Sequence, residues 1–546
     1  MRPIRLAFSA RPFASRTIAA SFGLPTRTRL RAQTLPPPLP ISTRRYISSE
    51  EAIPRTIAKF LEWKPDVAVE HVAVNGFIRS VRSMKARSFV ALGDGSSLAS
   101  LQAIVPTNLA EGLAIGAAIQ LTGTWVPSPG AKQSHELHVN NVEVLGPSDA
   151  KTFPIQKKYQ TPEYLRTMPH LRPRTPFNSA LLRLRSEAIA TLTQFFATRD
   201  FVQTHPPIIT SSDCEGGGQV FTVAPANEQQ DEAAESFFRA PKYLTVSTQL
   251  HLEALAQAVG NVWTLSPTFR AEESDTSRHL SEFYMLEAEM SFVDELDGIM
   301  DLTEDMLRFL SISMYDSRVG RELRSPGTER NSGDSAGDRV PPEEVDSRWQ
   351  GLMQPAWPRI TYDDAVEILS KEEDLFDHPV VWGAGLHSEH EKYIARVVGE
   401  GKPVFVTHYP MAIKPFYMRP TGSDGKHSLG AAPTHSATAD CFDLLVPDFC
   451  EIAGGSMREN RLPQLLCAME RQGMATPFLD DGYPSNIDDP THAAGSLDWY
   501  VDLRRWGCPP HGGFGLGFDR LLGYLSGVQS IRDTVAFPRW AGRCDC

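Results

Sequence analysis

The sequence predicts an α+β protein in which a small N-terminal β-barrel precedes a larger domain of helices and strands. Three observations indicate this fold class. Five short strand patterns follow one another within 71–145, and apolar residues recur at helical spacing in 181–196 and 296–310. The stretch 269–289 alternates roughly apolar and polar residues on both sides of a turn-rich centre, which is typical of a strand–loop–strand hairpin. The chain's 546 residues suffice for two or more domains with a large core.

The composition is that of an ordinary soluble globular protein, with 41% hydrophobic and 22% charged residues. No apolar run reaches the length of about 18 residues that a membrane-spanning helix needs, so we expect no membrane association. The seven cysteines include no CxxC pair and are odd in number. This argues against a disulfide framework or a structural zinc site and predicts free thiols in a reducing compartment.

The first 49 residues contain nine arginines and no Asp, Glu or Lys, and they are rich in Ser and Thr. This composition predicts a mitochondrial transit peptide over 1–46 and a protein of the mitochondrial matrix. A disordered basic arm that contacts RNA is the alternative. The whole chain has a net charge of −12, so the remainder without nine arginines is near −21. Binding to nucleic acid must therefore come from local patches rather than from net charge.

Residues 68–148 are expected to form the barrel, with strands at 72–79, 88–92, 101–105, 118–123 and 138–144. Cations surround two phenylalanines on the first two strands, and aromatic rings stack unpaired bases while cations hold phosphates. We expect Phe77 to be a core residue, whereas Phe89 fits either the core or a base-stacking position. The candidate RNA contacts are Phe89, Arg79, Arg82 and Arg87.

The larger domain is expected over 178–540, after a Pro-rich basic hinge at 149–177. Its first elements are the amphipathic helix of 181–196 and a strand over 201–210 that prolines end. A Gly-rich loop follows at 213–221, but it lacks the Gly-Lys-Ser/Thr of a P-loop. Residues 316–350 are rich in Gly, Ser, Pro, Arg and acids with little apolar content, which predicts a disordered insertion.

The stretch 269–289 organises the rest of the chain. Its second strand interleaves Glu282, Glu287 and Glu289 with apolar residues. Charges next to buried apolar groups are costly unless they are paired or bind a ligand. The hairpin therefore predicts a ligand site rather than a solvated face.

These residues resemble motif 2 of class II aminoacyl-tRNA synthetases, and in detail the asparaginyl enzymes of the aspartate-like subgroup. Residues 451–459 are similar to a run characteristic of that subgroup, and 513–520 resemble motif 3. Residues 181–210 look like motif 1, and the predicted barrel resembles the subgroup's OB-fold anticodon-binding domain.

The resemblance implies an antiparallel class II sheet flanked by helices, an N-terminal OB-fold barrel and a homodimer. It also implies a two-step reaction, in which asparagine attacks the α-phosphate of ATP and the acyl group of the asparaginyl-adenylate then passes to tRNA(Asn). The implied cofactors are ATP and Mg²⁺. An aspartyl-tRNA synthetase, including a non-discriminating one, is the alternative, and a synthetase-like paralogue that does not charge tRNA is a second.

The same resemblance assigns roles to individual residues. Arg270 would bridge the substrate carboxylate and the α-phosphate, and Arg520 would hold the γ-phosphate and cover adenine opposite Phe283. Asp443 and Glu451 would hold Mg²⁺. The other implied ATP contacts are Glu272, Arg278, His279, Leu280, Gly515 and Gly517, and the implied amino-acid contacts are Glu215, Gln249, Glu287, Gly454 and Arg458. Among these, Glu287 would accept the amide hydrogens of asparagine and Arg458 would donate to its oxygen.

Overall fold

The computed structural model describes residues 53–130, 133–211, 220–225, 237–238, 241–274, 276–325, 339–422, 437–474 and 497–546. The expected transit peptide and Glu215 lie outside the described residues. Within these ranges no helix combines the length and the apolar character needed to cross a membrane.

The N-terminal part is a closed five-stranded barrel, as predicted. Its strands pair in the order β1-β2-β3-β5-β4, and the short helix α1 (Ile57–Glu62) precedes them. Their bounds are β1 Val69–Ser83, β2 Arg87–Gly93, β3 Leu101–Pro106, β4 Ala118–Pro127 and β5 His135–Gly146. Phe60 of α1 packs against Trp125 of β4, with ring centroids 5.6 Å apart, so the helix contributes to the barrel core.

Phe77 is not a core residue, so that expectation was wrong. Its side chain is 43% exposed, because the alternation along β1 places Val72, Val74 and Ile78 inside the barrel and Phe77 outside. Phe89 of β2 is half-buried beneath the guanidinium of Arg82, which lies 5.7 Å from the ring centroid.

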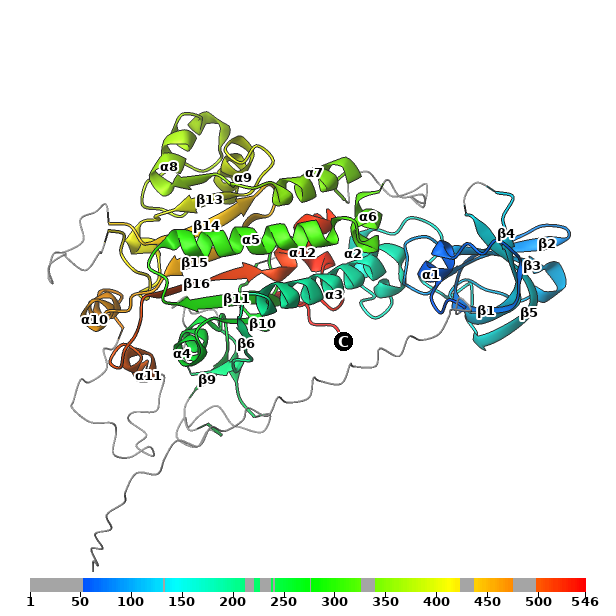
Figure 1. Ribbon diagram of the computed structural model, residues 1–546, viewed down its shortest axis with the longest axis horizontal. Helices are drawn as coiled ribbons and strands as arrows, with labels where there is room; N and C mark the ends of the chain where they lie inside the picture. The colour runs from blue at the N-terminus through cyan, green and yellow to red at the C-terminus, as the bar shows by residue number, and fades with distance from the viewer. Residues whose placement is uncertain are drawn as a thin grey trace, which may run out of the picture. The chain divides into compact units, whose positions relative to one another are not determined.

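The larger part is built on an eight-stranded sheet with the order β12-β13-β14-β15-β16-β11-β10-β6 (Figure 1). Pairing is antiparallel from β13 to β10, and only the two edge strands run parallel to their neighbours. This agrees with the expected antiparallel sheet flanked by helices. The bounds are β6 Val202–Gln203, β10 Val262–Phe269, β11 Glu282–Ser291, β12 Arg359–Thr361, β13 Val404–Thr407, β14 Cys441–Val446, β15 Cys450–Met457 and β16 His511–Gly517.

The two faces of the sheet bury different helices. Phe405 of β13 and Leu286 of β11 belong to the largest core, together with α3 (Pro176–Ala197), α5 (Leu296–Tyr315) and α12 (Phe518–Ser526). Val404 and Val406 point to the other face, where they pack with α8 (Tyr362–Ser370) and α9 (Ser388–Val397). Figure 1 shows α3 and α5 lying across the first face.

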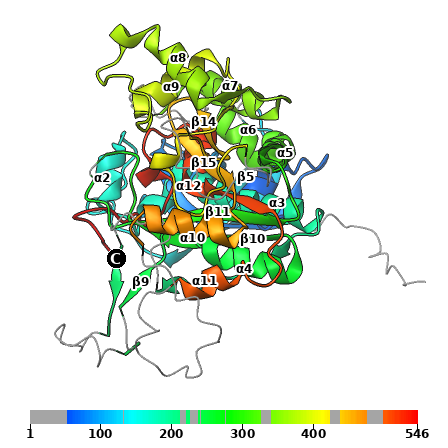
Figure 2. The same cartoon turned by 90° about the vertical axis from the view of Figure 1, so that its left-hand side faces the viewer.

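The helices α8 and α9 lie towards the β13 end of the sheet, and α4 (Gln249–Val259) lies towards the β10 end (Figures 1 and 2). The short strands β7 (Ile209–Thr210), β9 (Lys242–Leu244) and β8 (Thr222–Val223) form a separate three-stranded sheet. The other helices are α2 Pro162–Arg166, α6 Arg318–Arg324, α7 Pro342–Met353, α10 Leu462–Arg471 and α11 Asp498–Asp502.

Two further expectations need correction. The predicted strand over 201–210 is two strands in different sheets, because Pro206 and Pro207 between them cannot donate to a ladder. The predicted disordered insertion over 316–350 contains α6 and the start of α7. Their few apolar side chains recur at helical spacing and join the largest core, and they are Val319, Leu323, Val345 and Trp349. Residues 326–338 between these helices lie outside the described residues.

Candidate active site

The site lies on the sheet face opposite α3 and α5. Along β11 the odd-numbered residues point to this face, and each is paired with a glycine of β16 from Met285 to Glu289. Glu289 is paired with Gly513, and a Cβ atom there would overlap the Glu289 carboxylate. A Cβ atom on Gly515 would lie 3.2 Å from the sulfur of Met285. The glycines of β16 therefore leave room for the side chains of β11 and for a ligand above them.

One cavity brings together every residue that was predicted to contact ATP. It is also lined by Met285, Ile452, Asp519 and Ile531, which the sequence did not single out. The predicted residues in its wall are Arg270, Glu272, Arg278, His279, Leu280, Phe283, Glu451, Gly515, Gly517 and Arg520. They come from the β10–β11 hairpin, from β15 and from the β16–α12 junction, so three distant segments of the chain form one wall.

The charged residues of the loop between β10 and β11 contact one another. Arg270 follows β10 directly, with its guanidinium 5.7 Å from the ring centroid of Phe283 and 3.9 Å from Glu272. Glu272 also lies 3.2 Å from Nε2 of His279. Burial lowers the pKa of His279, and three nearby arginines, Arg520, Arg278 and Arg270, add to the effect against the opposing charge of Glu272. The net effect favours the neutral form of the His279 imidazole.

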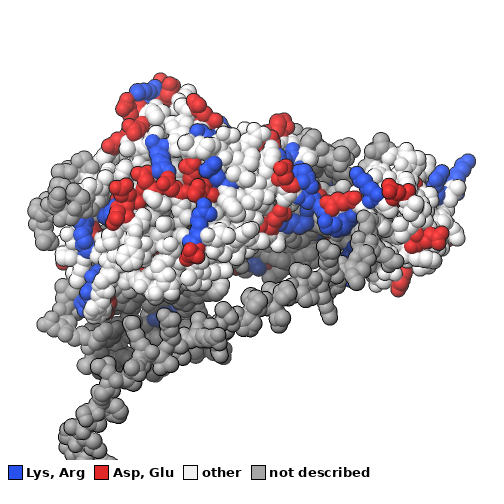
Figure 3. All heavy atoms as spheres, viewed as in Figure 1, with Lys and Arg blue, Asp and Glu red and all other residues white. Residues whose placement is uncertain are grey.

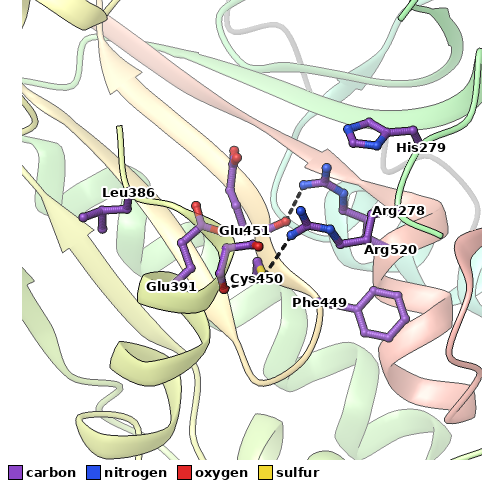
Figure 4. A pocket seen from close by; sticks show the side chains of 9 residues that line it. Arg278, His279, Leu386, Glu391, Phe449, Cys450, Glu451 and Arg520 are labelled. Carbon is purple, nitrogen blue, oxygen red and sulfur yellow. Dashed lines mark hydrogen bonds between the residues drawn. The ribbon is translucent and has the colours of Figure 1, made fainter. Parts of the chain in front are cut away.

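Arg278 and Arg520 face the adjoining cavity shown in Figure 4, which Glu391, Cys450 and Glu451 also line. Nη1 of Arg520 donates to the main-chain oxygen of Glu451 at 2.6 Å, and Nη1 of Arg278 donates to the sulfur of Cys450 at 3.3 Å. These contacts leave N–H groups of both guanidiniums available to a ligand. Two permanent cations at one end of the cavity suit the phosphates of a nucleotide.

Carboxylates meet opposite these arginines. A Cβ atom on Gly454 would lie 3.0 Å from Oε1 of Glu451 and 3.4 Å from Oδ1 of Asp443, so both predicted metal ligands converge over this glycine. Nζ of Lys414 lies 3.1 Å from Oδ2 of Asp443. Glu391 of α9 adds a third acid, and burial together with Glu451 and Asp443 raises its pKa to about 7. Hard carboxylate oxygens fit Mg²⁺.

The predicted amino-acid contacts lie farther along the same face. Arg458 is buried after β15 and bonds Glu289, with 2.9 Å from Nη2 to Oε2 and 3.2 Å from Nε to Oε1. Glu287 turns to the start of α4, where its two oxygens accept from Thr248 N at 3.2 and 3.0 Å. The hydroxyls of Ser247 and Thr248 bond Glu287 as well. Gln249 is the next residue, at the first turn of α4.

Comparison with known proteins agrees with this geometry. The family model described as tRNA synthetases class II (D, K and N) matches residues 161–541, and the model for an OB-fold nucleic acid binding domain matches residues 72–145. The mitochondrial asparagine–tRNA ligase of Schizosaccharomyces pombe is 37% identical over 90% of this chain and 98% of its own length. The chain belongs to the class II aminoacyl-tRNA synthetases, and among them to the asparagine–tRNA ligases.

Further similarities extend over most of the synthetase. The mitochondrial asparagine–tRNA ligase of Saccharomyces cerevisiae is 39% identical over 89% of this chain and 95% of its own length. The crystal structure of asparaginyl-tRNA synthetase from Pyrococcus horikoshii complexed with asparaginyl-adenylate matches with a TM-score of 0.72 and 27% identity, covering 90% of this chain and 99% of that chain. Synthetases of this class use ATP, and their substrates are an amino acid and a tRNA.

The barrel of the synthetase separates its predicted RNA contacts into two groups. Arg82, Arg87 and the half-buried Phe89 lie on the outer surface of β1 and β2. Arg79 instead crosses Gly93 and donates within the protein, with 2.9 Å from Nη1 to the oxygen of Leu98. On the face carrying α3 and α5, acidic and basic side chains are intermixed, and no large basic surface is visible there (Figure 3). A role for the barrel residues in RNA binding stays a prediction.

Several residues of the site were missed because they carry no local signal. Glu391 comes from α9, in a segment without a recognised motif, and only the fold brings it to Glu451. Glu253, Tyr500, Arg504 and His511 bond one another behind Gln249 although the chain separates Glu253 from the other three by more than 240 residues. The helical spacing of Gln249 and Glu253, four residues apart, was the one available hint.

Proposed function

We propose that this chain attaches asparagine to tRNA(Asn) for mitochondrial translation, through an asparaginyl-adenylate formed from asparagine and ATP. The observation that carries the proposal is the continuity of the site. The cavity with Arg270, Arg278 and Arg520 lies on the same sheet face as the Arg458–Glu289 pair. A nucleotide and an amino acid can thus lie next to each other. The mitochondrial relatives in two yeasts support the substrate and the compartment.

The first step joins two anions, since the α-carboxylate of asparagine and the α-phosphate are both ionised at neutral pH. No strong base is required, and catalysis consists mainly of positioning and charge neutralisation. Arg270 lines the cavity beside Phe283, so its fork can bridge the carboxylate and the α-phosphate. Arg278 and Arg520 would receive the β- and γ-phosphates, and Phe283 would stack on adenine.

Glu451 and Asp443 are the residues we assign to Mg²⁺. Their convergence over Gly454 supports the assignment, because hard cations prefer grouped carboxylate oxygens. A bound Mg²⁺ neutralises phosphate charge. In this arrangement Lys414 would hold the orientation of Asp443, and Arg520 would fix the main chain of Glu451.

Asparagine and aspartate differ in an amide NH₂ against a carboxylate oxygen. Arg458 is the donor we assign to the side-chain oxygen of asparagine, while Glu287 presents an acid that repels aspartate. Because a polar mismatch in a dry site costs several kcal/mol, these residues can set the choice. The first experiment compares the two amino acids directly.

The barrel is proposed to hold unpaired bases of tRNA(Asn) on Phe89, with Arg82 and Arg87 on phosphates. We also propose a homodimer. It is supported by exposed apolar side chains on α3, on β6 and at the start of β7, and these are Leu182, Val202, Ile208 and Ile209. The Arg-rich stretch 1–49 supports import into the mitochondrial matrix.

The test is ATP–pyrophosphate exchange by the purified chain with asparagine and, separately, with aspartate, beside a charging assay with mitochondrial tRNA. Exchange and charging with asparagine alone are expected. Exchange with aspartate would indicate the activity of an aspartyl-tRNA synthetase instead. Failure with both amino acids would exclude the proposed activity and favour a synthetase-like paralogue.

A further inference from the structure

A buried polar network lies directly behind the proposed amino-acid pocket, and Glu253 is at its centre. Glu253 belongs to α4, and its side chain is 0% exposed. Its carboxylate accepts from the Tyr500 hydroxyl at 2.9 and 2.8 Å, from Nη2 of Arg504 at 2.7 Å and from Nε2 of His511 at 3.0 Å. None of these four residues belongs to the nucleotide cavity.

Glu253 also bonds Gln249, one turn earlier on α4. The distance from Nε2 of Gln249 to Oε1 of Glu253 is 3.1 Å. Only the NH₂ side of the amide can face a carboxylate, because the carbonyl side would be repelled. Glu253 therefore fixes the orientation of the amide and leaves the oxygen of Gln249 as an acceptor. An acceptor at this position suits the α-ammonium group of an amino acid.

The same carboxylate helps to hold Arg458. Oε1 of Glu253 lies 3.9 Å from Nε of Arg458, whose guanidinium is fixed mainly by Glu289 and by the hydroxyl of Ser456 at 2.5 Å from Nη1. Three of the five N–H groups of Arg458 are used in the bonds to Glu289 and Ser456. The remaining N–H groups are thus held in a fixed direction.

Electrostatics keep Glu253 and His511 ionised although both are buried. Burial would raise the pKa of Glu253, but Arg504, His511 and Arg458 hold it well below its ordinary value. Burial would lower the pKa of His511, but its contacts with Cys508 and Glu253 and the charge of Glu289 raise it to about 10. The ligand atoms of Glu253, Glu289 and His511 lie within 4.8 Å of one another, as in a metal site. In place of a metal ion, the positively charged side chain of Arg458 contacts the carboxylate of Glu289, and those of Arg504 and His511 contact the carboxylate of Glu253.

We propose that Glu253 is the positioning residue of the amino-acid pocket. It sets the amide of Gln249 as an acceptor and keeps Arg458 aligned on Glu289, so the pocket is ordered before asparagine binds. The inference rests on the proposed function, because it takes Gln249 and Arg458 as contacts of asparagine. It predicts that an uncharged substitute at Glu253 weakens the use of asparagine and leaves the use of ATP nearly unchanged.

The experiment compares Glu253→Gln in the full chain with the unchanged protein, by ATP–pyrophosphate exchange at varied asparagine and at varied ATP. We expect KM for asparagine to rise about ten- to a hundredfold, as for the loss of a hydrogen bond to a buried charge, with KM for ATP within about threefold. Glu304→Gln is the matched control. Glu304 is also a buried acid on a helix, but it accepts from the main chain of Ala356 and Trp357, away from the site.

A second variant keeps the inference testable if Glu253→Gln does not fold. Tyr500→Phe removes one donor to Glu253 without changing charge, and we expect a rise in KM for asparagine of about three- to tenfold. An unchanged KM for asparagine in both folded variants, or an equal rise for ATP, would overturn the positioning role. If the unchanged protein gives no asparagine-dependent exchange, the proposed function itself fails, which is a different result.

Discussion

The guanidinium of Arg458 lies against the carboxylate of Glu289 in a two-point contact, with 2.9 Å from Nη2 to Oε2 and 3.2 Å from Nε to Oε1. Both side chains are buried, and Gly513 beneath Glu289 has no Cβ that would push the acid away. This contact orients the donor that we assign to the side chain of asparagine.

Replacement of Arg458 by Lys is expected to lower kcat/KM for asparagine by about a hundredfold. A lysine retains the charge but cannot match both oxygens of Glu289 and still donate to a ligand. The loss corresponds to about 3 kcal/mol of transition-state stabilisation. Exchange kinetics at saturating ATP measure it. A decrease in kcat/KM of less than about threefold would contradict the role of Arg458 as a contact of asparagine.

The preference for asparagine over aspartate should respond differently to changes at Glu287 and at Glu289 of β11. We expect Glu287→Gln to reduce the preference for asparagine over aspartate by about tenfold or more, because a repulsive charge is lost. Glu289→Gln should instead weaken both amino acids, since it leaves Arg458 without a full charge partner. The ratio of kcat/KM for asparagine to kcat/KM for aspartate measures the preference in each variant. An unchanged ratio in Glu287→Gln would end the role we assign to that acid.

Arg270→Ala is expected to reduce kcat of adenylate formation by about 10² to 10³, as for the removal of a group that stabilises charge in the transition state. Arg199→Ala is a suitable control, because Arg199 lies after α3 and pairs with Asp305 on the surface. Single-turnover measurement of adenylate separates this step from product release. Loss of activity in both variants would point to a general loss of folded protein.

Stability should fall at alkaline pH because of His511. Its pKa is about 10 in the folded chain and 6.5 when unperturbed, so between these values the folded state holds a proton that the unfolded state has lost. The stabilisation is complete below pH 6.5 and is lost as the pH rises through 10. We expect the free energy of unfolding to decrease from pH 7 to pH 9.5, and less steeply in His511→Gln. Denaturant titrations at both pH values measure this, and equal slopes would contradict it.

Phe89→Ala should raise KM for tRNA about five- to fiftyfold, if one base stacks on this ring. ATP–pyrophosphate exchange without tRNA should not change, because Phe89 is a barrel residue and does not line the nucleotide cavity. Val144→Ala removes an exposed apolar side chain from β5 and serves as the control. Equal charging kinetics in Phe89→Ala and the unchanged protein would exclude base stacking at this position.

Much of the nucleotide cavity was predictable because its residues are concentrated in short stretches. The hairpin of β10 and β11 and the Gly-rich strand β16 each have a local pattern, and the sheet pairs them directly. Glu391 and Glu253 could not be predicted, since their partners come from distant segments and depend on how helices α4 and α9 dock. The helices α6 and α7 were not predicted because their apolar residues are sparse, although a few side chains such as Trp349 are enough to anchor a helix.

The contact between Arg458 and Glu289 has a consequence beyond the enzyme. If the proposed function is taken together with this geometry, a pocket that tolerates a carboxylate would load aspartate onto tRNA(Asn). Every such error would insert an acid at an asparagine codon and add a negative charge to a newly made mitochondrial protein. The accuracy of the organelle's genetic code at these codons would then depend on how firmly one buried guanidinium is held in place.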